Sequence, residues 1–179
     1  MSQHPLSLIC KKVDYTHSQQ TAELLDLLQA YALDPMGGAK AIPDDVLQSL
    51  PSALQKRSFM FSIIVYLTSD DANTVRTEAK QNLIPIAFAN CIESFSTFKA
   101  KAVINIHDFA VLEAYRGKGV SKALIRAIEE EARQRNACKL TLEVLSKNDS
   151  AKNAYKKAGF EAYELDPASG QALFWEKPL

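Results

Sequence analysis

The sequence predicts an α/β fold in which one mixed β-sheet carries helices on its faces. The 179 residues are 47% hydrophobic and 23% charged, which is typical of one globular domain with a sizeable core. Three apolar segments follow one another in the middle of the chain, and such a run predicts an antiparallel meander. A strand, a long amphipathic helix and a further strand come next, and this order requires a crossover between parallel strands.

The first third of the chain predicts one strand and then two helices. Residues 6–13 form a short candidate strand, and apolar side chains recur at helical spacing over residues 18–33. The turn sequence at 34–38, Asp-Pro-Met-Gly-Gly, ends this helix because proline cannot continue it. Pro43 and the two aspartates after it start a second helix, which we expect Pro51 to interrupt or end.

The middle of the chain predicts three successive strands. Residues 58–67, 83–93 and 102–111 are rich in β-branched and aromatic side chains. The polar segment 68–81 predicts a surface loop, and residues 95–101 connect the second strand to the third. With no helix between them, consecutive strands are expected to pair antiparallel.

A long helix and another strand follow a glycine-containing turn. The helix has one apolar face, at steps of three and four residues, formed by Val120, Ala123, Leu124, Ala127, Ile128 and Ala132. On its polar face, Glu129 and Arg133 are spaced for an ion pair across one turn. Residues 139–145 alternate between apolar and polar side chains, as expected for a strand.

The end of the chain predicts a short helix and two final strands. The helix covers residues 150–158, and the strands cover 160–165 and 172–176. Phe174 and Trp175 in the last strand are expected to lie in the core. The complete order is then β-α-α-β-β-β-α-β-α-β-β, in a single domain that spans residues 1–179.

Composition and charge exclude several classes of function. The chain carries 21 basic and 21 acidic side chains, so its formal net charge is zero. This balance argues against nucleic-acid or anionic-membrane binding, which would need a basic face. No apolar stretch approaches the roughly 18–20 residues that cross a bilayer. Residues 1–13 lack the pattern of a signal peptide, so a cytoplasmic location is expected.

The three cysteines, Cys10, Cys91 and Cys138, predict neither a disulfide framework nor a metal site. Their number is odd, their spacings are wide, and no Cys-x-x-Cys pair occurs. We expect three reduced, mostly buried thiols and no bound metal.

The segment 115–121, Tyr-Arg-Gly-Lys-Gly-Val-Ser, follows a strand and opens the long helix. A helix start offers unpaired N–H groups and a positive dipole end, and glycines let an anion approach the backbone closely. Arg116 and Lys118 add positive charge, so the segment predicts a phosphate site, with a plain tight turn as the alternative. It matches neither the P-loop pattern nor the Gly-x-Gly-x-x-Gly dinucleotide pattern.

A second informative segment runs from Asn148 to Phe160. Asn148 is a good N-cap residue that should sit at the end of the preceding strand. Tyr155 follows seven residues later and can face the same cleft, although a half-buried packing role is the simpler interpretation of this residue alone.

Together the two segments resemble the acetyl-CoA-binding core of the GNAT superfamily of N-acetyltransferases. That family has a strand, an Arg/Gln-x-x-Gly-x-Gly/Ala loop and a long helix, and here the loop spans Arg116 to Ser121. In the family, that helix is followed by a strand, an asparagine, and a second helix that carries a tyrosine before a Gly-Phe pair. Here the asparagine is Asn148, the tyrosine is Tyr155 and the glycine is Gly159. The resemblance is specific over about the last hundred residues, and Ser121 stands where the family has Gly or Ala.

The resemblance implies the GNAT acyl-CoA N-acyltransferase fold, with acetyl-CoA as co-substrate. Its pyrophosphate would lie on the glycine loop, and its pantetheine arm would lie along the strand before that loop like an added strand. A free N–H near Val111 would stabilise the oxyanion of the thioester. The expected cofactor-binding residues are Phe109, Ala110, Val111, Arg116, Gly117, Lys118, Gly119, Val120, Ser121, Asn148 and Tyr155.

Acyl transfer to an amine also needs a base and an acid. Tyr155 matches the position of the general acid in the family. The two residues that match the position of the general base are His107 and Asp108. We prefer His107 as the base and Asp108 as an anchor for the substrate ammonium. Adjacent strand residues point to opposite faces, so both enter one cleft only if a bulge intervenes. Glu93 on the preceding strand is a third candidate.

The resulting prediction is an N-acetyltransferase that acetylates a primary amine directly, without a covalent enzyme intermediate. The short chain favours a small-molecule acceptor, and the turn at 34–38 is expected near the acceptor pocket. Dimerisation is common in the family, so a homodimer is compatible with the resemblance. Two alternatives stay open: a non-catalytic acyl-CoA-binding or sensing module on the same fold, and an interaction domain whose glycine loop is only a turn.

Overall fold

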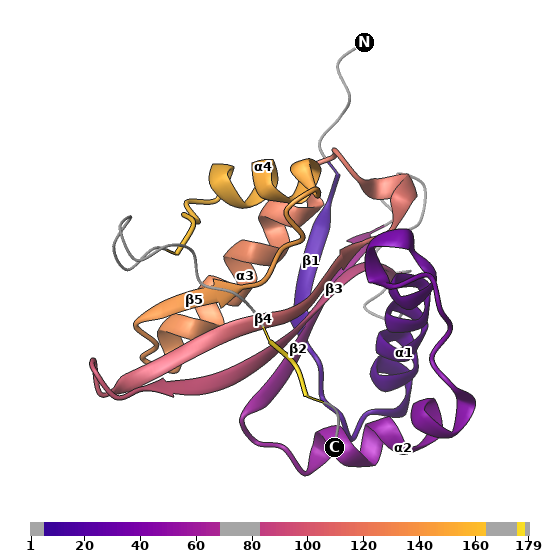
Figure 1. Cartoon of the computed structure of the whole chain (residues 1–179). Helices are drawn as coiled ribbons and strands as arrows, with labels where there is room; N and C mark the ends of the chain where they lie inside the picture. Colours follow the sequence, from indigo (N-terminus) through magenta and orange to yellow (C-terminus); the bar gives the residue numbers. More distant parts are fainter. Residues whose placement is uncertain (1–5, 69–82, 164–174, 178–179) are drawn as a thin grey trace, which may run out of the picture.

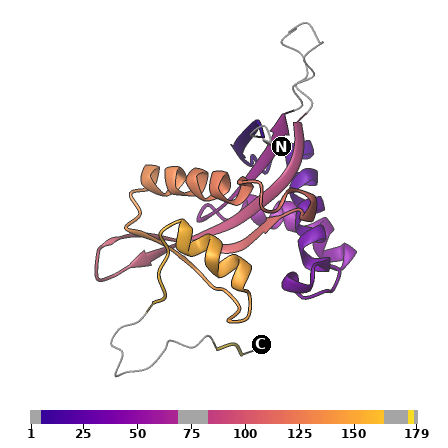
Figure 2. The ribbon, with the colours of Figure 1, turned by 90° about the horizontal axis from the view of Figure 1, so that it is seen from above.

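The computed structural model describes residues 6–68, 83–163 and 175–177. Its strands form one five-stranded sheet in the order β1-β2-β3-β4-β5, with α1 and α2 on one face and α3 and α4 on the other (Figures 1 and 2). The elements are, in chain order, β1 (Leu8–Lys12), α1 (Ser18–Leu33), the 3₁₀ turn η1 (Pro35–Gly37), α2 (Asp44–Gln55), β2 (Met60–Thr68), β3 (Leu83–Ser96), β4 (Lys101–Val111), the 3₁₀ turn η2 (Glu113–Tyr115), α3 (Val120–Gln134), β5 (Lys139–Leu142) and α4 (Asp149–Lys157).

The pairing of the strands confirms both topological predictions. Strands β1 to β4 pair antiparallel in succession, and β4 pairs parallel with β5 across the α3 crossover. The parallel pairing joins only Val103–Ile106 of β4 to Lys139–Leu142. Strand β4 continues to Val111, so its last five residues have no partner on the β5 side. The two strands therefore part at this end of the sheet.

A bulge in β4 changes which side chains face each helix layer. Asn90 of β3 pairs with Asp108, whereas the next residue, Cys91, pairs with Ile106, so His107 is the extra residue. Ile106 packs on the α3 face, and Phe109 packs on the same face three residues later. Since a regular strand alternates with period two, the extra residue shifts the pattern and turns Asp108 to the α1 face.

Two hydrophobic clusters hold the helices to the sheet. On one face, α3 packs its apolar stripe into the sheet, and Val120, Leu124, Ile128 and Ala132 are buried as predicted. Ile125 is buried as well, which the stripe alone did not predict. The predicted ion pair between Glu129 and Arg133 is present at 3.1 Å. On the other face, a second cluster joins the sheet to α1 and α2.

The prediction that Pro51 interrupts or ends the second helix is wrong. Helix α2 runs from Asp44 to Gln55 with Pro51 inside it. A proline removes one helical hydrogen bond and costs about 3 kcal/mol in a helix interior. Leu50 packs against the second cluster and Leu54 is buried in it, so tertiary contacts on both sides of the proline offset this cost.

The two strands predicted at the end of the chain are not confirmed. Residues 160–163 and 175–177 form no strand, and the remainder of the predicted strands 160–165 and 172–176 lies outside the described residues. Trp175 is 83% exposed rather than in the core, and Phe174 is not among the described residues. Apart from Thr68, the predicted loop 68–81 also lies outside them. Strand β5 ends at Leu142, because the backbone leaves the sheet there to line the opening beside β4.

No helix in the described part of the chain is long and apolar enough to cross a membrane. Within the same residues, no group of three or more His, Cys, Asp or Glu side chains is arranged to hold a metal ion. Cys91 is buried, while Cys10 and Cys138 are partly exposed, and all three thiols are free.

Candidate active site

The glycine loop leads from the end of β4 into α3. Gly117 has a φ of 72° and Gly119 a φ of 83°, both in the left-handed region that favours glycine. Among the described residues, the N–H groups of Gly117, Gly119 and Ser121 donate to no other backbone group. Gly119 is the N-cap of α3 and offers no side-chain cap, so the first turn of the helix also keeps its donors free. This loop can hold an anion such as a phosphate.

Arg116 is engaged within the protein rather than free. Its guanidinium donates to the Asp34 carboxylate at 2.6 Å and, through Nε, to the Val111 carbonyl at 3.0 Å. The Arg116 hydrogen bond, followed by the Met36 N–H, lowers the pKa of Asp34. The positive charge that Arg116 was expected to add to the loop is balanced by Asp34, and the side chain ties the end of α1 to the glycine loop.

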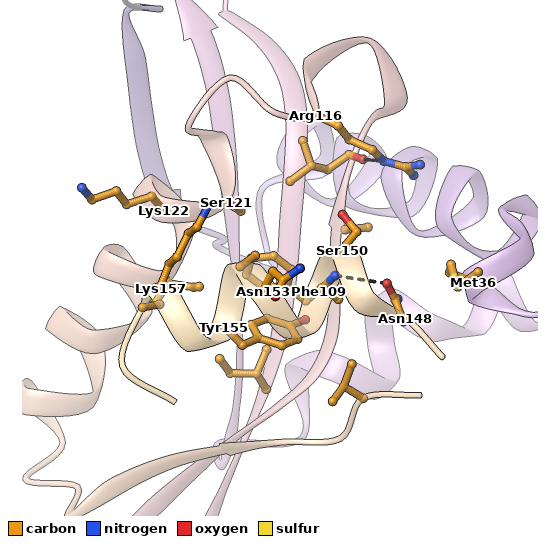
Figure 3. Close-up of a pocket in the computed structure, with 18 of the residues that line it drawn as sticks. Met36, Phe109, Arg116, Ser121, Lys122, Asn148, Ser150, Asn153, Tyr155 and Lys157 are labelled. Atoms are coloured by element: carbon orange, nitrogen blue, oxygen red, sulfur yellow. Dashed lines mark hydrogen bonds between the residues drawn. The ribbon is translucent and has the colours of Figure 1, made fainter. Parts of the chain in front are cut away.

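A cleft of about 1030 Å³ opens where β4 and β5 part (Figure 3). It is bounded by the glycine loop, α3, α4 and the C-terminal end of α1. Most of the expected cofactor-binding residues line it, namely Phe109, Ala110, Val111, Arg116, Gly117, Gly119, Ser121, Asn148 and Tyr155. Lys118 and Val120 do not. Lys118 lies over the Tyr115 ring at 5.7 Å, and the Val120 side chain is buried in the core, which leaves only its N–H for a ligand.

Asn148 starts α4 and so places Tyr155. Its amide oxygen accepts from the Ala151 N–H at 3.1 Å, which makes Asn148 the N-cap of the helix. It does not sit at the end of the preceding strand, because β5 ends six residues earlier at Leu142. From this start, the helix carries the Tyr155 side chain into the cleft (Figure 3).

Tyr155 is packed between two aromatic rings. Its ring meets Phe109 of β4 and Phe160 edge to face, each with centroids 5.8 Å apart. Burial, with a smaller contribution from the nearby Tyr31, raises the pKa of Tyr155 to about 12. The hydroxyl therefore keeps its proton at neutral pH and is able to donate it or to form a hydrogen bond.

The bulge separates the two candidate residues of β4. His107 is exposed and lines the cleft. Asp108 is half-buried on the α1 face, where its carboxylate accepts from the Asn90 amide at 2.9 Å, and it is not among the lining residues. The third candidate, Glu93, does not line the cleft either. Its carboxylate pairs with Arg135 at 2.8 Å, which removes it as a base.

The cleft also contains residues outside the set of expected cofactor-binding and catalytic residues. Lys122 and Arg126 of α3 and Lys157 of α4 bring three cations to its wall (Figure 3 labels the two lysines). The spacing of Lys122 and Arg126, one turn apart directly after the glycine loop, was a usable signal. Tyr31, at the C-terminal end of α1, lines the cleft as well, and nothing in its local sequence marked it.

The overall architecture is that of known acetyltransferases. The structure superposes with a TM-score of 0.71 on an aminoglycoside acetyltransferase from an uncultured soil metagenomic sample, solved in complex with sisomicin. The two sequences are 14% identical, and the match covers 96% of each chain. At this identity the likeness establishes the fold.

The model of the acetyltransferase (GNAT) family matches residues 44–160, which is more than half of the chain. The protein belongs to the GNAT family of acetyltransferases, whose members use acetyl-CoA.

Curated relatives match over about a third of this chain. The uncharacterised N-acetyltransferase YycN of Bacillus subtilis strain 168 is 39% identical over 60 residues, which are 34% of this chain and 38% of the relative. The streptothricin acetyltransferase of Streptomyces lavendulae is 40% identical over 65 residues, 36% of this chain and 34% of the relative. The matches thus span little more than a third of these relatives.

Proposed function

We propose that the protein is an N-acetyltransferase that moves the acetyl group of acetyl-CoA directly to a primary amine of a small molecule. The observation that carries the proposal is one cleft that combines the free N–H groups of the glycine loop with the protonated hydroxyl of Tyr155. The first feature suits a pyrophosphate, and the second suits a leaving thiolate.

The charges around the cleft support the cofactor. We assign the pyrophosphate to the N–H groups of Gly117, Gly119 and Ser121, which donate to no other backbone group among the described residues and line the cleft. Lys122, Arg126 and Lys157 lie on the same wall and can neutralise the remaining phosphate of coenzyme A. Because Arg116 is committed to Asp34, these three side chains replace it as the source of positive charge.

The free edge of β4 supports a place for the thioester. The Leu112 N–H donates to the Ile86 carbonyl of β3, so the N–H of Val111, one residue earlier, points away from β3 into the opening. This N–H can receive the oxyanion that develops on the acetyl carbonyl. The acetyl-CoA thioester supplies the activated acetyl group, and the other steps fall to side chains of the cleft.

The proton transfers can then be assigned. His107, exposed on the cleft wall, takes a proton from the substrate ammonium, which frees the amine to attack. The new C–N bond forms as the C–S bond breaks, and Tyr155 donates its proton to the departing sulfur. The nitrogen of the new amide gives up its remaining extra proton, which restores the Tyr155 hydroxyl. Asp108, on the α1 face beside the cleft, holds the ammonium before deprotonation.

The first test measures thermal unfolding with acetyl-CoA and with AMP as control. At about 100 times its Kd, acetyl-CoA adds about 2.7 kcal/mol of stability, which raises Tm by several degrees. Release of free thiol is then followed with sisomicin, streptothricin and lysine as acceptors. Stabilisation with thiol release supports the enzyme. Stabilisation without release from any amine supports the acyl-CoA-binding module instead, and no stabilisation at millimolar acetyl-CoA overturns both.

A further inference from the structure

Four polar side chains form a continuous chain of hydrogen bonds across the α1 face of the sheet. The Tyr15 hydroxyl, in the connection between β1 and α1, lies 2.8 Å from Ser62 Oγ of β2. Ser62 Oγ donates to Asn90 Oδ1 of β3 at 2.6 Å, and Asn90 Nδ2 donates to Asp108 Oδ2 of β4 at 2.9 Å. Ser62 is 1% exposed and Asn90 5% exposed, so the middle of the chain is shielded from water.

Chemistry fixes the direction of every bond in this chain. A carboxylate only accepts, so the amide nitrogen of Asn90 faces Asp108 and its oxygen faces Ser62. The single hydroxyl proton of Ser62 is used toward Asn90. The Tyr15 hydroxyl must therefore donate to Ser62, and all three donors point toward Asp108. Bonds that point the same way polarise one another and reinforce the last of them.

One oxygen of Asp108 is left open. Oδ2 accepts from Asn90, and Oδ1 has no hydrogen-bond partner among the described residues. Among the described residues of the protein, every buried side-chain oxygen has a hydrogen-bond partner. Since Oδ1 of the half-buried Asp108 has no such partner, it is accessible to solvent. The residues on both sides of Asp108, His107 and Phe109, line the cleft. The Asp108 charge also contributes, after burial, to raising the pKa of Tyr31, which lines the same cleft.

We propose that Tyr15, Ser62 and Asn90 are positioning residues that fix the Asp108 carboxylate, with Oδ1 presented to the ammonium of the acceptor amine. The proposal rests on the proposed function, because only an amine acceptor gives this carboxylate a cation to hold. An amide in the middle of the chain does not pass protons readily, so the chain orients Asp108 rather than relaying protons away from it.

A purely structural role is the competing explanation, since buried polar groups need partners for stability alone. The two explanations differ in what a mutation changes. Loss of a structural bond lowers Tm and affects both substrates alike. Loss of positioning raises the KM of the amine and leaves the KM of acetyl-CoA unchanged, and it has no effect once Asp108 has lost its charge.

The test compares Tyr15→Phe and Ser62→Ala, each alone and combined with Asp108→Asn, using the best amine of the panel of sisomicin, streptothricin and lysine. Tyr66→Phe is the matched control, because Tyr66 is a buried tyrosine on the same face whose hydroxyl donates to Glu23 at 2.6 Å. Tyr15→Phe removes only the outermost donor, so it keeps the test valid even where Ser62→Ala does not fold.

We expect Tyr15→Phe to raise the KM of the amine about three- to tenfold and to change the KM of acetyl-CoA by less than about twofold. Asp108→Asn should raise the KM of the amine more, about 10- to 100-fold, and Tyr15→Phe should add nothing to it. Tyr66→Phe should change neither KM. Additive effects, or equal effects on both substrates, overturn the positioning role alone. Absence of thiol release by the wild-type protein overturns the proposed function and this inference with it.

Discussion

Removal of the Tyr155 hydroxyl tests the proposed acid directly. In Tyr155→Phe the ring and both of its edge-to-face contacts, to Phe109 and Phe160, are retained. The hydroxyl makes no hydrogen bond to another described residue, and burial already raises its pKa to about 12. Its removal should therefore change the free energy of unfolding by less than about 0.5 kcal/mol.

The effect on turnover should be far larger than the effect on stability. A positioned general acid contributes about 10²- to 10⁴-fold, so kcat should fall by that factor, or about 2.7–5.5 kcal/mol of barrier. The thermal shift with acetyl-CoA should stay the same, because the glycine loop and its N–H groups are untouched.

The assay follows thiol release at saturating amine and acetyl-CoA, with a parallel thermal unfolding series. Tyr163→Phe is the control, since this tyrosine is 61% exposed and does not line the cleft. An unchanged kcat would refute the acid role of Tyr155. A lower kcat together with a lost acetyl-CoA shift would show that Tyr155 acts through cofactor binding instead.

Three other variants test the remaining parts of the site. Gly119→Ala places an L-residue at a φ of 83° with open space around its Cβ, so it should cost about 1 kcal/mol of stability and raise the KM of acetyl-CoA. The control is Gly38→Ala, at a φ of 109° but outside the cleft lining, which should share only the cost in stability. Equal KM values of acetyl-CoA in the two variants would contradict the phosphate site. Asp34→Asn should cost at most about 1 kcal/mol at pH 7, because the ion pair is partly exposed. Since the folded protein lowers the pKa of Asp34, this difference in the free energy of unfolding between wild type and variant is present above the ordinary pKa of 3.8 and should vanish as the pH falls below it. Urea titrations that show a constant difference from pH 7 to 3 would refute the pairing. His107→Gln should lower kcat by about 10²- to 10⁴-fold, which is the contribution of a positioned general base, and an unchanged kcat would shift the base role to Asp108 or to a water.

Local pattern predicted most of the architecture. The apolar stripe from Val120 to Ala132 defined α3 and its buried face, and the strand–helix–strand order correctly implied the parallel pair β4–β5. Residue type and spacing also singled out the two segments around Gly119 and Tyr155, because backbone conformation and helix capping are local properties, whereas their roles came from the resemblance to the GNAT family.

The errors concern contacts between segments distant in sequence. The Arg116–Asp34 ion pair joins residues 82 positions apart, and no spacing rule identifies such a partner. Pro51 was misjudged because the packing of Leu54 on the sheet decides the outcome. The Tyr15–Ser62–Asn90–Asp108 chain crosses four segments, and its members share a face only through the register of β2, β3 and β4.

The bulge at His107 makes the site tolerant of the loss of one particular residue. Deleting His107 would remove the bulge and restore strict alternation in β4, with Asp108 directly after Ile106. Asp108 would then stay on the α1 face beside Asn90, and Phe109 would stay on the α3 face beside Tyr155. A single-codon deletion here would therefore remove the exposed imidazole from the cleft wall, while the aromatic and the carboxylate side chains of the strand kept their faces.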